Sequence, residues 1–107
     1  MMNDPGIFAT MYTMRSMRRL KPDPLPRDVV EKVLEAGIQA PNGQNTQPWA
    51  FVVLQAPADK AFFRDQYMRV MKERLRAGPP PPEDTSQRAR NGRAAWYLAE
   101  HLHEAPV

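Results

Sequence analysis

Cysteine is absent from this sequence of 107 residues, which excludes disulfide bonds, thiolate metal sites, iron–sulfur clusters and cysteine nucleophiles. No apolar run approaches the roughly 20 residues that a membrane-spanning helix needs. The N-terminal residues have no basic stretch followed by an apolar one, so they do not resemble a secretory signal. Together these absences predict a cytoplasmic protein with no membrane partner.

Proline and arginine are the residues in excess. The 12 prolines are about twice the average usage of roughly 5%. Four of them are consecutive, at 79–82, and predict an extended, mobile loop. Arginine supplies 11 of the 15 basic residues, and the net charge is +3. That balance permits a phosphate or nucleic-acid partner without requiring one.

Apolar spacing predicts helices separated by one strand. A helical face extends over residues 7–19, and amphipathic helices are predicted at 26–39, 58–76 and 87–104. The unbroken apolar run 49–54 predicts a strand that is buried on both faces. Because a single strand needs partners for its backbone donors and acceptors, we expect an incomplete domain, or one that another chain completes.

A basic cluster follows the first predicted helix. It contains Arg15, Ser16, Arg18 and Arg19. Guanidinium groups and a hydroxyl within five residues suit a phosphate, which binds donors held in a fixed fork. A solvated basic turn explains this composition equally well. A nucleic-acid site is the weaker interpretation, because no aromatic side chains alternate with the arginines.

An uncharged, amide-rich loop precedes the apolar run. Residues 41–48 include the side-chain amides of Asn42, Gln44, Asn45 and Gln47. Amides both donate and accept, which suits the edge of a neutral heteroaromatic ring that carries carbonyl and N–H groups. The alternative is turn chemistry, in which Asn-Gly supplies a positive φ and asparagine caps the backbone. Residue types alone favour the turn.

Other polar residues form no catalytic or metal-binding pattern. His101 and His103 are two apart, so a helix places them on different sides, and no metal site is predicted. Glu31 and Glu35 fit the solvated face of their helix, and no acid–base pair or nucleophile is evident. We therefore predict no catalytic side chain.

In their order along the chain, these segments resemble the nitroreductase family of FMN-dependent oxidoreductases. Arg15-Ser16-Met17-Arg18 resembles its Arg-Ser-x-Arg segment. Residues 40–53, APNGQNTQPWAFVV, resemble its Ala-Pro-Ser-x-x-Asn-x-Gln-Pro-Trp-x-Phe motif, and residues 99–107 resemble the helix that feeds its next core strand. The resemblance extends from about residue 12 to the last residue, and the two motifs are specific in combination.

The resemblance implies a fold, a cofactor and a reaction. The fold would be an α+β sandwich, of which residues 1–107 would be the N-terminal part of one nitroreductase domain, with its first core strand. The protein would be a homodimer with FMN in the interface. Hydride would pass from NAD(P)H to the flavin and then to a nitroaromatic, a quinone or a similar acceptor.

The resemblance also implies site residues. Those expected at the FMN phosphate and ribityl chain are Arg15, Ser16 and Arg18. Those expected at the isoalloxazine ring, contributed by the partner subunit, are Pro41, Asn42, Gly43 and Asn45, with Gln47 nearby. Two positions depart from the family pattern. Met14 replaces a further arginine, so phosphate binding is expected either to be weaker or to depend on Arg19. Asn42 replaces a serine, which keeps hydrogen-bonding capacity but changes the reach of that side chain.

Two other functions remain open on the sequence. One is a truncated, non-catalytic half-domain that acts as an interaction module, which a stable 107-residue product would favour. The other is a small basic protein that binds phosphate or nucleic acid, for which salt-sensitive binding would be the sign. As the N-terminal part of a nitroreductase domain, residues 1–107 alone are expected to be inactive as an oxidoreductase and poorly stable.

Overall fold

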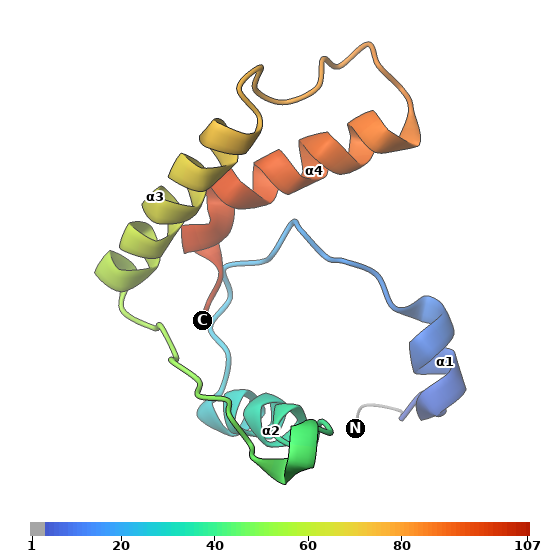
Figure 1. Cartoon of the computed structure of the whole chain (residues 1–107), viewed down its shortest axis with the longest axis vertical. Coiled ribbons are helices and arrows are strands. Elements are labelled where there is room, and N and C mark those ends of the chain that lie inside the picture. The colour runs from blue at the N-terminus through green and yellow to red at the C-terminus, as the bar shows by residue number, and fades with distance from the viewer. Residues whose placement is uncertain (1–3) are drawn as a thin grey trace.

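The computed structural model describes residues 4–107, which form helices joined by extended or turned segments (Figure 1). In chain order, the helices are α1 Gly6–Thr13, α2 Arg27–Gly37, the 3-10 helix η1 Gly43–Asn45, α3 Pro57–Arg74, α4 Gln87–His101 and the 3-10 helix η2 Leu102–Glu104. Residues 1–3, part of the stretch interpreted as lacking a secretory signal, lie outside the described residues.

The predicted α+β sandwich is wrong for this chain, because no strand forms anywhere in residues 4–107. Residues 49–54, predicted as the first core strand, form no backbone hydrogen bond to another described segment. Val52 is 84% exposed and Phe51 52% exposed, so the run is not buried on both faces. A strand exists only where a neighbouring extended segment pairs with its N–H and C=O groups, and the described chain supplies no such neighbour.

The first helix is shorter than its apolar spacing predicts. The helical face was expected over residues 7–19, but α1 ends at Thr13 and the residues that follow leave the helix. In a continued helix, Arg15 would lie three and four positions from Arg18 and Arg19. Like charges at that spacing destabilise a helix. The arginines therefore lie in a non-helical segment, residues 14–19, which we call the basic segment.

Proline and serine mark the starts of the longer helices. Pro26 precedes α2, and Pro57 occupies the first position of α3, where its missing N–H removes no helical bond. Ser86 caps α4: the Ala89 amide donates to its Oγ at 3.2 Å. Such a cap contributes about 1 kcal/mol.

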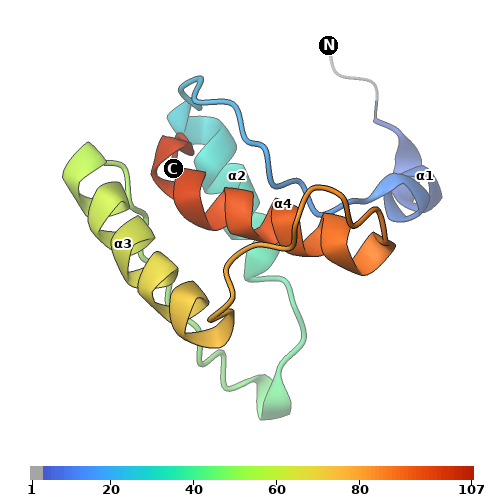
Figure 2. The ribbon, with the colours of Figure 1, turned by 90° about the horizontal axis from the view of Figure 1, so that it is seen from above.

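The packed part of the chain is the pair α3 and α4 with η2 (Figures 1 and 2). Met68, Ala89, Ala99 and Ala105 are the buried apolar residues among those described. Three of them are alanines, whose small side chains let neighbouring backbones approach closely. Lys60 on α3 donates from Nζ to the Ala105 carbonyl at 2.8 Å, which ties α3 to the segment after η2.

The polyproline loop lies against α4, although its composition predicts a mobile segment. Arg93 donates from Nη1 to the carbonyls of Pro81, at 2.7 Å, and Asp84, at 2.8 Å. A Cβ on Gly92 would lie 2.8 Å from Cγ of Pro80, so the proline ring occupies the space that this glycine leaves. The loop is thus docked on α4 by one arginine and one glycine.

Outside this helical pair the chain is open. Its radius of gyration is 17.0 Å, whereas a compact domain of this length has about 13 Å. Its accessible surface is 9406 Å², against about 6,100 Å² for a compact protein of 12.2 kDa. The apolar stripes predicted to face a core are exposed, as Val33 on α2 (67%) and Phe63 on α3 (51%) illustrate.

Candidate functional site

The basic segment presents its guanidinium groups with few internal partners. Arg15 donates from Nη1 to the adjacent Met14 carbonyl at 2.8 Å, and its other donors are free within residues 4–107. Ser16 is exposed and Arg18 is half-buried. In the described chain, no carboxylate forms an ion pair with any of these arginines. The segment therefore offers uncompensated positive charge and many N–H donors, which a phosphate group would satisfy.

Arg19 is held by an aromatic ring. Its Cζ lies 3.8 Å from the ring centroid of Tyr97 on α4. The Tyr97 ring also stacks on the His101 imidazole, with centroids 4.0 Å apart and an interplanar angle of 19°. Nδ1 of His101 lies 3.0 Å from Glu104 Oε1, and this hydrogen bond lowers the pKa of the Glu104 carboxyl. On the sequence alone, His101 was considered as a metal ligand beside His103, and no such site was predicted.

The sequence spacing of Tyr97, His101 and Glu104 could have predicted their mutual contacts, but not the contact with Arg19. Tyr97 and His101 are four residues apart on a helix, and His101 precedes Glu104 by three, so both pairs face each other locally. The contact between Arg19 and Tyr97 joins segments that are distant in the sequence. No local pattern could have predicted it.

The amide loop is closed by its own side chains. Asn42 accepts at Oδ1 from the Gln47 backbone N–H at 2.8 Å, and Gln47 donates from Nε2 to Asn45 Oδ1 at 3.4 Å. Non-glycine residues with positive φ cluster here: Gln44 at 55°, Asn45 at 53° and Gln47 at 49°. Gly43, expected to supply the positive φ, has an ordinary value. Each left-handed non-glycine residue stores about 1 kcal/mol or more, and such strain concentrates at functional sites.

Four of the predicted ring-binding residues line one cavity. The cavity has a volume of about 490 Å³ and is bounded by Ile38, Gln39, Ala40, Pro41, Asn42, Asn45, Gln47 and Trp49. Gly43 is not among the lining residues and lies in η1. The Asn42 Nδ2 and Gln47 Oε1 atoms have no hydrogen-bond partner within residues 4–107. Two of the residues that line the cavity thus retain one unused donor, on Asn42, and one unused acceptor, on Gln47.

The basic segment and the amide loop lie well apart. In both views of the ribbon, the basic segment leads from α1 toward α4, whereas the amide loop lies beyond the end of α2 (Figures 1 and 2). Arg15, Ser16, Arg18 and Arg19 are close in sequence within one non-helical segment. The fold places Pro41, Asn42, Asn45 and Gln47 around one cavity, but it does not join the two groups within one chain.

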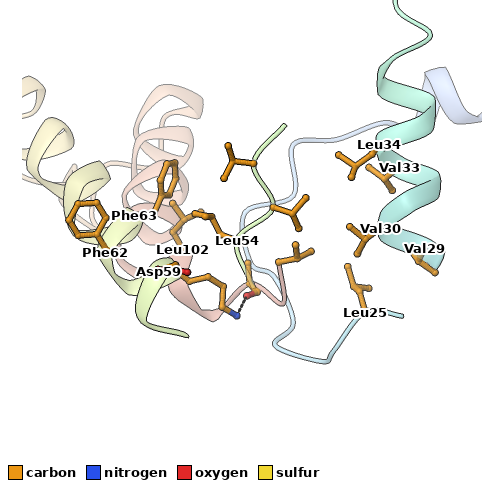
Figure 3. Close-up of a pocket in the computed structure, with 15 residues that line it drawn as sticks. Leu25, Val29, Val30, Val33, Leu34, Leu54, Asp59, Phe62, Phe63 and Leu102 are labelled. Atoms are coloured by element: carbon orange, nitrogen blue, oxygen red, sulfur yellow. Dashed lines mark hydrogen bonds between the residues drawn. The ribbon is translucent and has the colours of Figure 1, made fainter. Parts of the chain in front are cut away.

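A second hollow, which we call the apolar groove, lies between α2 and the first turns of α3 (Figure 3). Its volume is about 700 Å³, and its lining includes Leu25, Val30, Leu34, Leu54, Phe63 and Leu102. Asp59 and Lys60 are its charged members, and Lys60 is already bonded to the Ala105 carbonyl. The groove has neither free arginine nor amide groups, so it does not match the predicted cofactor contacts.

Two further classes of site are absent from the part of the chain that the structure describes. None of its helices has the length and hydropathy of a membrane span. Nor do residues 4–107 gather three or more His, Asp or Glu side chains where a metal ion could bind.

The two segments thus offer, at separate places, guanidinium donors of the kind that suit an anion and side-chain amides of the kind that suit the polar edge of a ring. Comparison with known proteins gives the family. The sequence profile of the nitroreductase family matches residues 12–107, and the chain belongs to that family. Both the basic segment and the amide loop fall within the matched region, and members of this family typically depend on FMN.

Curated relatives agree with this assignment. The chain is 43% identical over 51 residues to an NADH dehydrogenase of Thermus thermophilus, covering 48% of this chain and 25% of that protein. It is 31% identical over 116 residues to iodotyrosine deiodinase 1 of Rattus norvegicus, covering 99% of this chain and 36% of that protein. The chain thus spans about a third or less of the length of these relatives. No solved structure matches it significantly.

Proposed function

We propose that the protein containing this chain is an FMN-dependent oxidoreductase, with residues 1–107 as the N-terminal part of its nitroreductase domain. Hydride would pass from NAD(P)H through the flavin to a nitroaromatic, a quinone or a similar acceptor. The observation that carries this proposal is the family match over residues 12–107, which includes both candidate binding segments. A cytoplasmic location stays a prediction.

The basic segment would hold the phosphate end of FMN. Arg15 and Arg18 supply guanidinium groups without carboxylate partners in the described chain, and the Ser16 hydroxyl lies between them in sequence. Arg19 stands in for the arginine that the family pattern places at Met14. Charge-assisted bonds from a guanidinium fork are about twice as strong as neutral ones, so this end would dominate affinity.

The amide loop would bind the ring edge. Asn42 Oδ1 is used to close the loop, which leaves Asn42 Nδ2 as a donor and Gln47 Oε1 as an acceptor for a ring that carries both carbonyl and N–H groups. Asn42 therefore has two tasks, loop closure and ring contact. The backbone strain at Asn45 and Gln47 fits a loop shaped for binding.

The separation of the two segments supports a homodimer. One chain holds the basic segment near α4 and the amide loop beyond α2 (Figures 1 and 2). A single FMN would then take its phosphate contacts from one protomer and its ring contacts from the other. When bound, FMN carries the hydride chemistry, which is why no catalytic acid, base or nucleophile of this chain is required.

Flavin binding by the whole protein tests the proposal. We expect purified protein, supplied with FMN, to retain it stoichiometrically and to oxidise NAD(P)H. Arg15→Gln should weaken FMN binding more than riboflavin binding, because riboflavin lacks the phosphate. The matched control is Arg27→Gln, an exposed arginine paired with Glu31 on α2, which should leave both affinities unchanged. A folded protein that retains no flavin would refute the proposal.

A second acceptor class has its own support. A relative that aligns with 99% of this chain is an iodotyrosine deiodinase, so reductive removal of iodine from an iodotyrosine is the alternative reaction. Comparing a nitroaromatic, a quinone and an iodinated tyrosine as acceptors, under the same NAD(P)H supply, separates the two classes.

A non-catalytic interaction module is a further alternative, and the apolar groove is the observation in its favour. An interaction module would bind no flavin. The flavin-retention experiment therefore decides between it and the oxidoreductase.

A further inference from the structure

The Tyr97 ring is occupied on both faces. Arg19 Cζ lies 3.8 Å from its centroid and the His101 ring centroid lies 4.0 Å from it. Two groups cannot both lie that close above the same face of one ring, so the guanidinium and the imidazole are on opposite faces. Glu104, 3.0 Å from Nδ1 of His101, fixes the outer end of this stack.

The stack of Arg19 on Tyr97 connects the basic segment to α4. Among the described residues, no ion pair and no backbone or side-chain hydrogen bond joins residues 14–25 to another element. Arg15 bonds only to its neighbour's carbonyl. Among the polar contacts of the described residues, the contact between Arg19 and Tyr97 is therefore the one that links this segment to α4.

Stacking leaves the Arg19 guanidinium able to bind an anion. A guanidinium is planar, and its N–H donors point outward in that plane. The aromatic ring contacts only the flat face of the guanidinium, so the N–H donors stay available. A phosphate at the edge and Tyr97 at the face can therefore hold the same arginine together. A side chain already fixed by stacking also loses less rotational freedom when a ligand arrives.

We infer that Tyr97 is a positioning residue for the phosphate site: its ring holds Arg19, and with it the basic segment, in the orientation that binds the anionic end of the cofactor. This inference rests on the proposed function and adds to it a residue of α4 that neither sequence motif contains. Tyr97 would act through Arg19, whose guanidinium it contacts.

The test compares Tyr97→Leu with Tyr97→Phe in the whole protein. Leucine removes the π face and phenylalanine keeps it, so the phenylalanine variant is the matched control. We expect Tyr97→Leu to raise the Kd for FMN about fivefold, to leave the Kd for riboflavin unchanged, and Tyr97→Phe to behave like the parent. In the Arg19→Gln background, Tyr97→Leu should cause no further loss, because the arginine through which it acts is gone.

A second variant avoids any change in α4. Arg19→Lys keeps the charge at an exposed position but loses the planar group, so it should weaken FMN binding while riboflavin binding is retained. The NMR signal of the Arg19 Nε–H in the flavin-free protein gives an independent readout. Its ring-current shift should vanish in Tyr97→Leu and persist in Tyr97→Phe.

The outcomes separate this inference from the proposed function. Unchanged FMN affinity in Tyr97→Leu, or equal losses for FMN and riboflavin, overturns the inference alone, provided that the parent protein binds FMN. A parent protein that binds no FMN overturns the proposed function and the inference together.

Discussion

Replacing Gly92 with alanine should destabilise the docking of the polyproline loop on α4. An alanine Cβ at this position would lie 2.8 Å from Cγ and 3.3 Å from Cδ of Pro80. Proline ring atoms are fixed to the backbone and cannot rotate away. The loop cannot shift freely either, because Arg93 holds its carbonyls at 2.7 and 2.8 Å.

The size of the effect comes from two opposing contributions. Alanine in place of glycine inside a helix stabilises by roughly 0.5–1 kcal/mol. Overpacking against the fixed proline destabilises by about 1–3 kcal/mol. The destabilisation from the clash exceeds the gain in helix propensity, so we expect the free energy of unfolding to fall by about 1 kcal/mol. Urea denaturation of the whole protein, with amide exchange in α4 as the local measure, gives the value.

A double-mutant cycle shows whether Pro80 is the cause. In a Pro80→Ala background the clash is gone, so Gly92→Ala should now stabilise by about 0.5–1 kcal/mol, a reversal of sign. Gly37→Ala in α2 is the matched control, because its Cβ would meet Phe51 Cζ at an ordinary 3.4 Å. Equal stabilisation by Gly92→Ala in both backgrounds would refute the docking of the loop on α4.

Three further outcomes are expected. Arg93→Ala should release the polyproline loop by removing both carbonyl bonds, which faster amide exchange or proteolysis at the loop would reveal. Asn42→Ala removes the acceptor of the Gln47 amide and should destabilise the amide loop by about 1 kcal/mol, whereas Asn42→Asp keeps an acceptor and should retain the loop conformation. The Ser86 backbone amide donates to the Asp84 carboxylate, which lowers the pKa of that carboxyl below its unfolded value. This hydrogen bond therefore stabilises the loop at neutral pH, and the stabilisation is lost as the pH falls through the lowered pKa. An NMR pH titration of the loop should show this change, and Asp84→Asn should abolish it. If instead the loop signals do not change on acidification, the hydrogen bond has no role in its structure.

Local signals in the sequence located the longer helices. Apolar stripes and prolines predicted helices at 26–39, 58–76 and 87–104, and the structure has α2, α3 and α4 within those ranges or one residue beyond them. These elements depend on i to i+4 contacts and on terminal residues, which are near neighbours in the chain. The amide loop and the basic cluster were equally visible, because each is a run of adjacent residues.

Non-local contacts decided what the sequence predicted wrongly or missed. The apolar run 49–54 has strand composition but forms no strand in the described chain, because a strand requires a partner and local residues cannot supply one. The polyproline loop docks because Gly92 leaves a space for Pro80. Arg19 meets Tyr97 only once α4 is in place.

The sequence by itself therefore indicated the family, the longer helices and the two candidate binding segments, since each of these is a pattern of residues that are close in the chain. The tertiary structure alone decided that the two segments lie apart in one chain, and which aromatic ring holds the basic segment. The physical reason is that pairing, stacking and burial act between residues that are distant in the sequence, and their partners are set by the packing of the helices.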